Sequence, residues 1–196
     1  MRREDITAVV LCGGSAARLG SVDKTLLEVD GHPLVGYTLE ALRPQIGGFV
    51  LSCGRDPAPY RRFGYPVTPD HAADEGPLGG IVSANGAIDS EWILTHPGDT
   101  PLPDPQLVAR LTPAAERAGV AVPRTGAYRQ HLVMLVSRGW LESLAQHYAQ
   151  GGRAGREWLD AAGAEEVDMA DIADSFFNVN TFEDLAQAKR RLHHPT

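Results

Sequence analysis

The stretch that decides the fold runs from residue 6 to residue 24 and reads ITAVVLCGGSAARLGSVDK. Its first part, Ile6 to Leu11, is a short apolar run that predicts a buried strand. Its second part carries three glycines and two cations, Arg18 and Lys24, directly after that strand. In open α/β sheets, ligands bind outside the carboxyl ends of the strands, and glycines let backbone N–H groups approach phosphate oxygens. The stretch therefore predicts a phosphate-binding loop.

Two better-known glycine-rich loops do not fit this spacing. A P-loop places Lys directly after its last glycine, whereas three residues separate Gly20 from Lys24 here. The dinucleotide fingerprint needs the pattern GxGxxG, whereas Gly13 and Gly14 are adjacent. The loop therefore indicates phosphate chemistry of a different class.

Beyond this loop, short apolar runs alternate with longer segments of helical period, a pattern typical of βαβ units around a mainly parallel sheet. Further strands are predicted at residues 49–53, 92–95, 120–122, 132–136 and 166–168, with a weaker candidate at Val67. Helices are predicted where apolar residues share one face, around residues 35–42, 107–118 and 140–148. The predicted fold is a Rossmann-like, three-layer α/β fold with a mostly parallel central sheet.

The clearest local signal belongs to the last helix. Thr181 followed by Asp184 resembles a capping box, in which each residue satisfies a backbone N–H group of the other. The buried stripe of this helix is predicted to contain Phe182, Leu185, Ala188 and Leu192.

Length and composition restrict the class of protein. At 196 residues and 43% hydrophobic, the chain suits one globular domain spanning residues 1–196. A net charge of −7 disfavours broad binding to nucleic acid or to anionic membranes, which need a basic surface. Without a run of about 18 apolar residues, and with Cys12 and Cys53 expected as reduced, buried thiols, the chain is expected to be cytoplasmic.

The run from Val10 to Leu34 resembles the signature of nucleotidyltransferases that activate sugars and cofactors. The shared features are Gly-Gly-x-x-x-Arg-x-Gly, Asp-Lys at 23 and 24, and Gly-His-Pro-Leu at 31–34. Within that superfamily, the chain is most similar to the molybdenum cofactor guanylyltransferases. Further segments match that family in order, namely Asp70, Gly76-Pro77-Leu78-Gly79-Gly80, Gly98-Asp99-Thr100-Pro101 and Asn178-Val179-Asn180-Thr181.

The resemblance implies a reaction and its partners. GMP would pass from GTP to the terminal phosphate of molybdopterin, with release of pyrophosphate. The N-terminal half would bind GTP, the C-terminal half would bind the acceptor, and molybdoenzymes that receive the cofactor would be further partners. The expected nucleotide-binding residues are Leu11, Cys12, Gly13, Gly14, Arg18, Lys24, Ser52, Asp70, Gly76, Pro77, Leu78 and Asp99.

Asp99 is the expected metal ligand, because a carboxylate at the end of a strand, opposite a phosphate loop, suits a hard cation with oxygen ligands. The resemblance implies Mg²⁺, held by Asp99 with phosphate oxygens and waters. It also implies that Asn178 and Asn180 face the acceptor. Arg18, Lys24 and Asp99 are the expected catalytic residues. They would act by positioning and charge neutralisation, since a phosphate nucleophile is already anionic and needs no general base.

Some positions depart from the family pattern. Cys12 stands where Ala is usual, Gly98 replaces a Cys, and Ser52 stands where Asn is frequent, which weakens the expected contact of Ser52. His131 lies where the family has His-Pro, but Leu132 follows it, and His131 is expected at the edge of a strand with its hydrogen bonds satisfied.

The residues leave several alternatives open. Asp70 would contact either the guanine base or the ribose, and a carboxylate can accept from guanine N1–H and N2–H together. The loop is shared with enzymes that use CTP or a different phosphorylated acceptor. A protein of another class, which binds GTP or delivers the cofactor without catalysis, also fits the loop alone.

Overall fold

A single eight-stranded sheet forms the centre of the protein, in the order β10-β9-β11-β8-β1-β6-β7 with β12 paired to β9. The computed structural model describes residues 1–12, 15–16, 22–54, 56–70 and 76–193. The strands are β1 (Ile6–Leu11), β6 (Gly48–Cys53), β7 (Val67–Pro69), β8 (Trp92–Pro97), β9 (Val120–Thr125), β10 (Tyr128–Arg129), β11 (Met134–Ser137) and β12 (Glu165–Asp168).

The sheet is mostly parallel, as predicted. β1 pairs in parallel with β6 and β8, β6 with β7, and β9 with β12. β11 is antiparallel to both β8 and β9, and β10 is antiparallel to β9. The carboxyl ends of β1, β6 and β8 therefore meet at one edge of the sheet.

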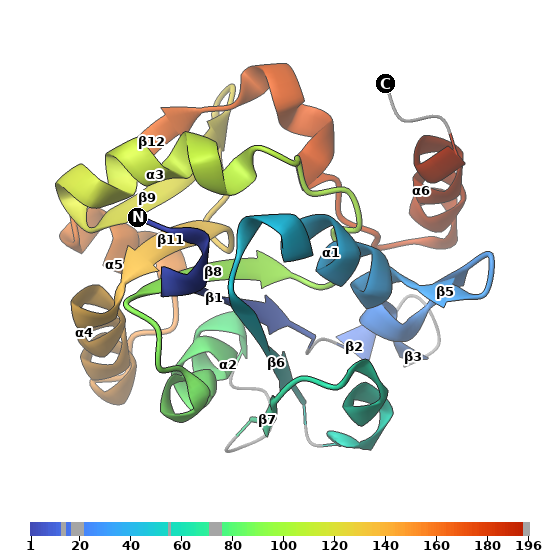
Figure 1. Ribbon diagram of the computed structural model, residues 1–196, viewed down its shortest axis with the longest axis horizontal. Coiled ribbons are helices and arrows are strands. Elements are labelled where there is room, and N and C mark those ends of the chain that lie inside the picture. Colours follow the sequence, from blue (N-terminus) through green and yellow to red (C-terminus); the bar gives the residue numbers. More distant parts are fainter. Residues whose placement is uncertain (13–14, 17–21, 55, 71–75, 194–196) are drawn as a thin grey trace.

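Helices cover both faces of this sheet and make three layers (Figure 1). One face packs against α1 (Leu34–Leu42) and α3 (Leu107–Ala118), and the other against α2 (Gly76–Ala84), α4 (Arg138–Ala149) and α5 (Gly155–Ala161). Side chains of successive strand residues point to opposite faces, so β1 contributes Ala8 and Val10 to one core cluster and Val9 and Leu11 to the other. The three-layer α/β prediction is confirmed.

Apart from the last helix, the remaining elements are short. Two-residue strands form two hairpins, β2 (Ser15–Ala16) with β3 (Val22–Asp23) and β4 (Glu28–Val29) with β5 (His32–Pro33). Single-turn and two-turn 3₁₀ helices complete the described chain, namely η1 (Arg3–Asp5), η3 (Lys24–Leu26), η4 (Arg43–Gln45), η5 (Ala58–Phe63), η6 (Asn85–Ala87) and η7 (Ala170–Phe176).

The last helix, α6 (Phe182–His193), begins with the predicted capping box. The Asp184 N–H group donates to Thr181 Oγ1 at 3.1 Å, and the Thr181 N–H group donates to Asp184 Oδ2 at 2.9 Å. The predicted buried stripe is only partly correct, because Ala188 is buried but Phe182 is 62% exposed. α6 packs beside the narrow β4–β5 hairpin rather than on the sheet (Figure 1), which leaves its first turn uncovered.

Several strand boundaries differ from the prediction; β9, for example, continues to Thr125 instead of ending at Val122. β8 continues to Pro97 because His96 is fully buried and stays in register with Val10 of β1. β11 starts later than expected, since the Val133 N–H group donates to the carbonyl of Gln130 at 2.8 Å and closes a turn there. The expectation for His131 is therefore wrong: it lies in this exposed turn and not at the edge of a strand.

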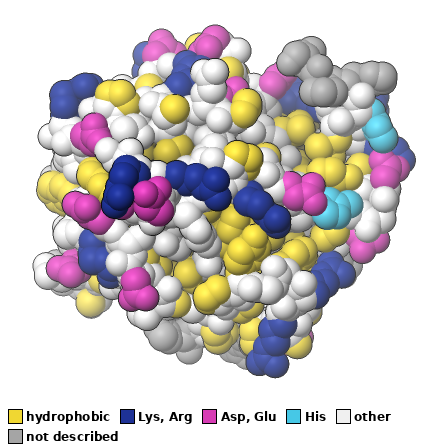
Figure 2. Space-filling view, viewed as in Figure 1, with side chains coloured by type: hydrophobic (Ala, Val, Ile, Leu, Met, Phe, Trp, Pro, Cys, Tyr) yellow, Lys and Arg dark blue, Asp and Glu magenta, His cyan; other side chains and the backbone are white. Residues whose placement is uncertain are grey.

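Charged side chains of both signs are mixed on the face shown in Figure 2, and no broad basic area covers it. Cys12 and Cys53 are buried free thiols, as expected. Across the described ranges, no helix combines the length and the apolar character needed to cross a membrane.

Candidate active site

The site is built at the edge where the parallel strands end. The Cys12 N–H group donates to the carbonyl of Ser52 at 2.6 Å, and the Gly98 N–H group donates to the carbonyl of Leu11 at 2.9 Å. These bonds continue the ladder beyond the last strand residues. A Cβ atom at Gly98 would lie 3.2 Å from both the Leu11 carbonyl oxygen and Thr25 Cγ2, so the close approach suits glycine. The segment after β8 is thereby held against the beginning of the glycine-rich segment.

Lys24, Asp99 and Asn180 come together at this edge from three distant parts of the chain. The Lys24 ammonium donates to Asn180 Oδ1 at 2.7 Å and lies 4.0 Å from Asp99 Oδ2. Burial raises the pKa of the Asp99 carboxyl group, and the nearby Lys24 charge offsets part of that rise. A desolvated carboxylate beside a single ammonium retains the capacity to bind a further cation.

The Asn178 to Asn180 segment is fastened to the loop that carries Asp99. Thr100 Oγ1 donates to Asn178 Oδ1, and the Val179 N–H group donates to the carbonyl of Asp99 at 2.9 Å. The Val179 side chain is fully buried. Of the two Asn side chains that were predicted to face an acceptor, Asn180 thus hydrogen-bonds to the lysine that pairs with Asp99, and Asn178 hydrogen-bonds to the next residue, Thr100.

Ser52, Asp70 and α2 form the neighbouring part of the edge. Ser52 is 2% exposed, and a Cβ atom added to Gly80 would lie 2.5 Å from Ser52 Oγ and 3.5 Å from Asp70 Oδ1. The Asp70 N–H group donates to the carbonyl of Cys53 at 2.9 Å. The glycine at position 80 therefore lets α2 pack directly on the serine that lies beside the Asp70 carboxylate.

The other nucleotide-binding candidates divide into two groups. Gly76, with φ of 69°, and Pro77 are exposed at the start of α2, while the side chain of Leu78 is buried in the core. Gly13, Gly14 and Arg18 lie outside the described residues. The described residues near them form a short antiparallel pair, in which Ser15 and Ala16 of β2 lie opposite Asp23 and Val22 of β3.

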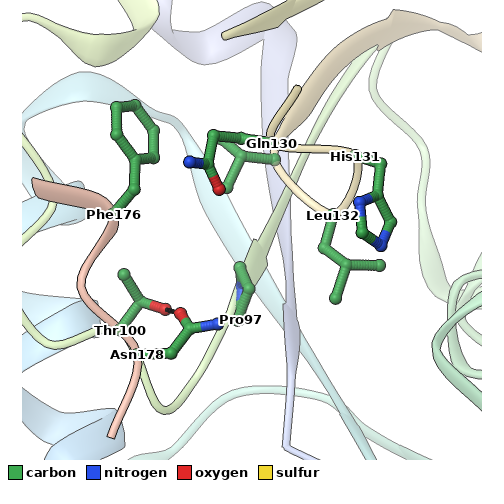
Figure 3. A pocket seen from close by; sticks show the side chains of 8 residues that line it. Pro97, Thr100, Gln130, His131, Leu132, Phe176 and Asn178 are labelled. Atoms are coloured by element: carbon green, nitrogen blue, oxygen red, sulfur yellow. Dashed lines mark hydrogen bonds between the residues drawn. The ribbon is translucent and has the colours of Figure 1, made fainter. Parts of the chain in front are cut away.

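A small cavity of about 60 Å³ lies next to the Asp99 loop. Phe176, Thr100 and Asn178 lie on one side of it, and Gln130, His131 and Leu132 lie on the other (Figure 3). Its walls thus combine an aromatic ring with amide, hydroxyl and imidazole groups. All of the lining residues except Pro97, the last residue of β8, belong to the C-terminal half of the chain.

Comparison with known proteins shows the family to which the chain belongs. The model of the MobA-like NTP transferase domain family matches residues 8–167. The chain belongs to this family. It is 38% identical to a molybdenum cofactor guanylyltransferase of an Acidovorax species, over 92% of this chain and 93% of that protein. It is 35% identical to the enzyme of the same name from Cupriavidus necator, over 96% of this chain and 98% of that protein.

The fold is also shared with solved structures. The molybdopterin-guanine dinucleotide biosynthesis protein A of Archaeoglobus fulgidus superposes with a TM-score of 0.78 at 23% identity, covering 95% of this chain and 98% of that one. The family model ends at residue 167 of the present chain. Asn178 and Asn180, which contribute to the edge described above, therefore lie beyond the part that the model matches.

One residue at this edge was not predicted from the sequence. Tyr60 of η5 is 1% exposed and places its hydroxyl 2.9 Å from the carbonyl oxygen of Cys12. Nothing in the sequence marked it, since a tyrosine between Pro59 and Arg61 resembles an ordinary packing residue. Its contacts depend on the three-dimensional approach of η5 to the end of β1.

Proposed function

We propose that this chain is a molybdenum cofactor guanylyltransferase, which transfers GMP from GTP to the terminal phosphate of molybdopterin and releases pyrophosphate. The observation that carries the proposal is the convergence of the Lys24 ammonium, the Asp99 carboxylate and the Asn180 amide at the end of the parallel strands. The names of the relatives at 38% and 35% identity support the choice of nucleotide and acceptor.

Asp99 fits a magnesium ion as the carboxylate ligand. Its side chain is 19% exposed, and burial makes its negative charge costly without a cation. Among the described residues, no group of three His, Cys, Asp or Glu side chains could hold a metal. Phosphate oxygens and waters would therefore complete the coordination, which is usual for Mg²⁺. Bound there, the ion would neutralise charge on the phosphate oxygens.

The chain itself would contribute charge and orientation. An oxygen of the acceptor's terminal phosphate attacks the α-phosphorus of GTP, and the bond to the bridging oxygen breaks as pyrophosphate leaves with the electron pair. The nucleophile is already anionic near neutral pH, so no side chain has to remove a proton. Lys24, Arg18 and the N–H groups of the glycine-rich segment would stabilise the triphosphate and the leaving pyrophosphate.

We assign guanine or ribose recognition to the edge around Asp70. Its carboxylate can accept two hydrogen bonds from guanine, a pairing that cytosine does not offer. Ser52 is buried under α2, which supports a role in holding Asp70 and Gly80 in place rather than in direct contact with the base. Leu11, Cys12 and the start of α2 would bound the same nucleotide.

The acceptor belongs on the other side of Asp99, in the C-terminal half. The small cavity there does not enclose a pterin, but the side chains at its rim support this placement, since the Phe176 ring and the Asn178 amide suit contact with a flat polar heterocycle. Asn178 and Asn180 would exchange part of their internal bonds for acceptor contacts. We place the reaction in the cytoplasm, because buried reduced thiols fit a reducing compartment. Molybdoenzymes would receive the product.

Measurement of pyrophosphate release tests the function directly. The protein is incubated with Mg²⁺ and GTP, CTP, ATP or UTP, each with molybdopterin, with a sugar phosphate or with no acceptor. Release with GTP and molybdopterin only is the expected result. Release with CTP would identify a cytidylyltransferase, and release with a sugar phosphate would identify a different acceptor. Binding of GTP without turnover on any acceptor would identify a non-catalytic protein.

A further inference from the structure

Tyr60 contacts both ends of the glycine-rich segment through one hydroxyl group. Its Oη atom lies 2.9 Å from the Cys12 carbonyl oxygen, immediately before the segment, and hydrogen-bonds to the Asp23 carboxylate at its far end. Thr25 Oγ1 lies 2.6 Å from the same Oη atom. A single buried phenol therefore joins two chain positions that the loop separates.

The contact with Asp23 extends directly to Lys24. Asp23 Oδ1 accepts from the Thr25 N–H group at 3.1 Å and from Thr25 Oγ1 at 2.8 Å, so the carboxylate caps the short helix η3. Lys24 is the first residue of that helix. Any shift of Asp23 relative to β1 would therefore move the Lys24 backbone, and with it the ammonium that faces Asp99 and Asn180.

The chemistry of the hydroxyl suits a fixed donor. The phenol is 1% exposed, and both burial and the neighbouring Asp23 charge raise its pKa, which keeps it protonated. The phenol carries one proton, so at any moment it donates either to Asp23 Oδ2 or to the Cys12 carbonyl, while the single proton of the Thr25 hydroxyl goes to Asp23 Oδ1. The ring packs in the core cluster that also contains Cys12 and Cys53, so the hydroxyl has little freedom to move away.

We propose that Tyr60 is a positioning residue for nucleotidyl transfer, which links Cys12 at the end of β1 to Asp23 and so holds Lys24 in place opposite Asp99. It acts through Cys12, Asp23 and Thr25 and touches no substrate. The inference rests on the proposed function for the identity of the reaction. It does not depend on which nucleotide or acceptor is used, because Lys24 would stabilise the triphosphate in every case.

The first test compares Tyr60→Phe with Tyr65→Phe. Tyr65 packs on Phe49 in the same region of the chain and is a matched control for the loss of a phenol hydroxyl. GTP dissociation constants are measured by calorimetry, and kcat and KM by pyrophosphate release, all normalised to folded protein by circular dichroism. We expect Tyr60→Phe to lower kcat/KM for GTP about tenfold or more, because small displacements of a charged group are costly in catalysis. The control should change it by less than about twofold. Equal values for the two variants would overturn the proposal.

A double-mutant cycle with Lys24→Ala separates positioning from general stabilisation. If Tyr60 acts through Lys24, Tyr60→Phe costs less than about twofold in the Lys24→Ala background. If the two losses multiply, Tyr60 does not act through Lys24 and the proposal fails. If Tyr60→Phe does not fold, Asp23→Asn replaces it. This variant keeps the phenol and removes the negative charge that accepts its hydrogen bond, and its effect on kcat/KM should likewise fall below about twofold in the Lys24→Ala background.

Failure of the proposed function gives a different pattern. If the wild-type protein releases no pyrophosphate with GTP and molybdopterin, the proposed function is wrong. The role of Tyr60 is then tested by the dissociation constants of GTP and pyrophosphate. A dissociation constant weakened about tenfold in Tyr60→Phe then supports the positioning role. Unchanged binding in that variant refutes it.

Discussion

The ammonium nitrogen of Lys24 lies 4.0 Å from a carboxylate oxygen of Asp99. One group belongs to the short helix after the glycine-rich segment and the other follows the central strand β8. Both side chains are about four-fifths buried, so the pair interacts through a medium that screens charge less than bulk water does. The separation is that of a loose ion pair, which leaves room for the oxygens of a ligand to reach both groups.

Replacement of Lys24 by Ala should lower kcat/KM for GTP by about 10²- to 10³-fold, as loss of a preorganised electrostatic group does in other enzymes. Steady-state pyrophosphate release measures the change. Arg117→Ala is the control, because Arg117 is an exposed cation that pairs with Glu165 and takes no part in the site, so its loss should leave turnover unaffected. Wild-type activity in Lys24→Ala would remove Lys24 from the mechanism.

Asp99→Asn should abolish most turnover and at the same time raise the melting temperature in the absence of metal. The folded-state pKa of Asp99 lies above its ordinary value, so its stabilising contribution is present at low pH and is lost as the pH rises through that pKa. The neutral amide removes this loss at neutral pH. Calorimetry at pH 7 measures the effect, and a lower melting temperature in the variant would contradict it.

Turnover should decrease as the pH falls through the raised pKa of Asp99, hence at a higher pH than for an ordinary carboxylate. Protonation removes the charge that would hold a cation, so protons and Mg²⁺ compete for the same group. Profiles of kcat/KM against pH at low and high Mg²⁺ concentration test this. The acidic limb should move to lower pH at high Mg²⁺, and profiles that coincide would argue against Asp99 as the ligand.

Gly80→Ala should destabilise the fold by about 1–3 kcal/mol, the usual cost of overpacking, and should weaken GTP binding through displacement of Asp70. The new Cβ atom would lie 2.5 Å from Ser52 Oγ. Ser52→Ala in the same chain removes that oxygen and should restore most of the stability. Gly86→Ala is the matched control, since its Cβ atom meets nothing within 4 Å. Denaturant unfolding and GTP calorimetry give the two readouts.

Asp30→Asn should loosen α6 from the β4–β5 hairpin. The Lys189 ammonium and, to a smaller extent, His193 lower the pKa of Asp30, so this contribution is present above the unfolded-state pKa and is lost as the pH falls through the folded-state value. Hydrogen exchange of the α6 amides should become faster in the variant at neutral pH. In the wild type, the same acceleration should appear on acidification. Equal exchange rates in both proteins would show that apolar packing alone docks the helix.

The sequence predicted the parts of this fold that depend on local pattern. The apolar run Ile6 to Leu11 marked β1 because a buried parallel strand needs apolar residues on both sides, and Thr181 with Asp184 marked the start of α6. The direction of β11 was not specified by its sequence, because an apolar run pairs in either direction. It is antiparallel to β8.

The site was predicted less completely, since it depends on contacts between distant segments. Residue type and position after a strand predicted that Asp99 and Lys24 belong to the site, and the structure places them together. The burial of Ser52 and the contacts of Tyr60 follow from how α2 and η5 pack, which no local pattern encodes. Phe182 was assigned to a buried face because helical period shows which residues share a face but not how wide the partner surface is.

The last strand of the sheet ends at Asp168, yet Asn178 and Asn180 reach the site from the segment beyond it. This segment packs on the β4–β5 hairpin in a small core cluster that includes Val179 and Ala188 and is separate from the two large ones. Polar groups beside Asp99 can thus change during evolution without repacking the sheet. The same arrangement suits an exchange of residues 177–193 between relatives. Such an exchange would alter the choice of acceptor while the N-terminal, nucleotide-binding half of the chain stays constant.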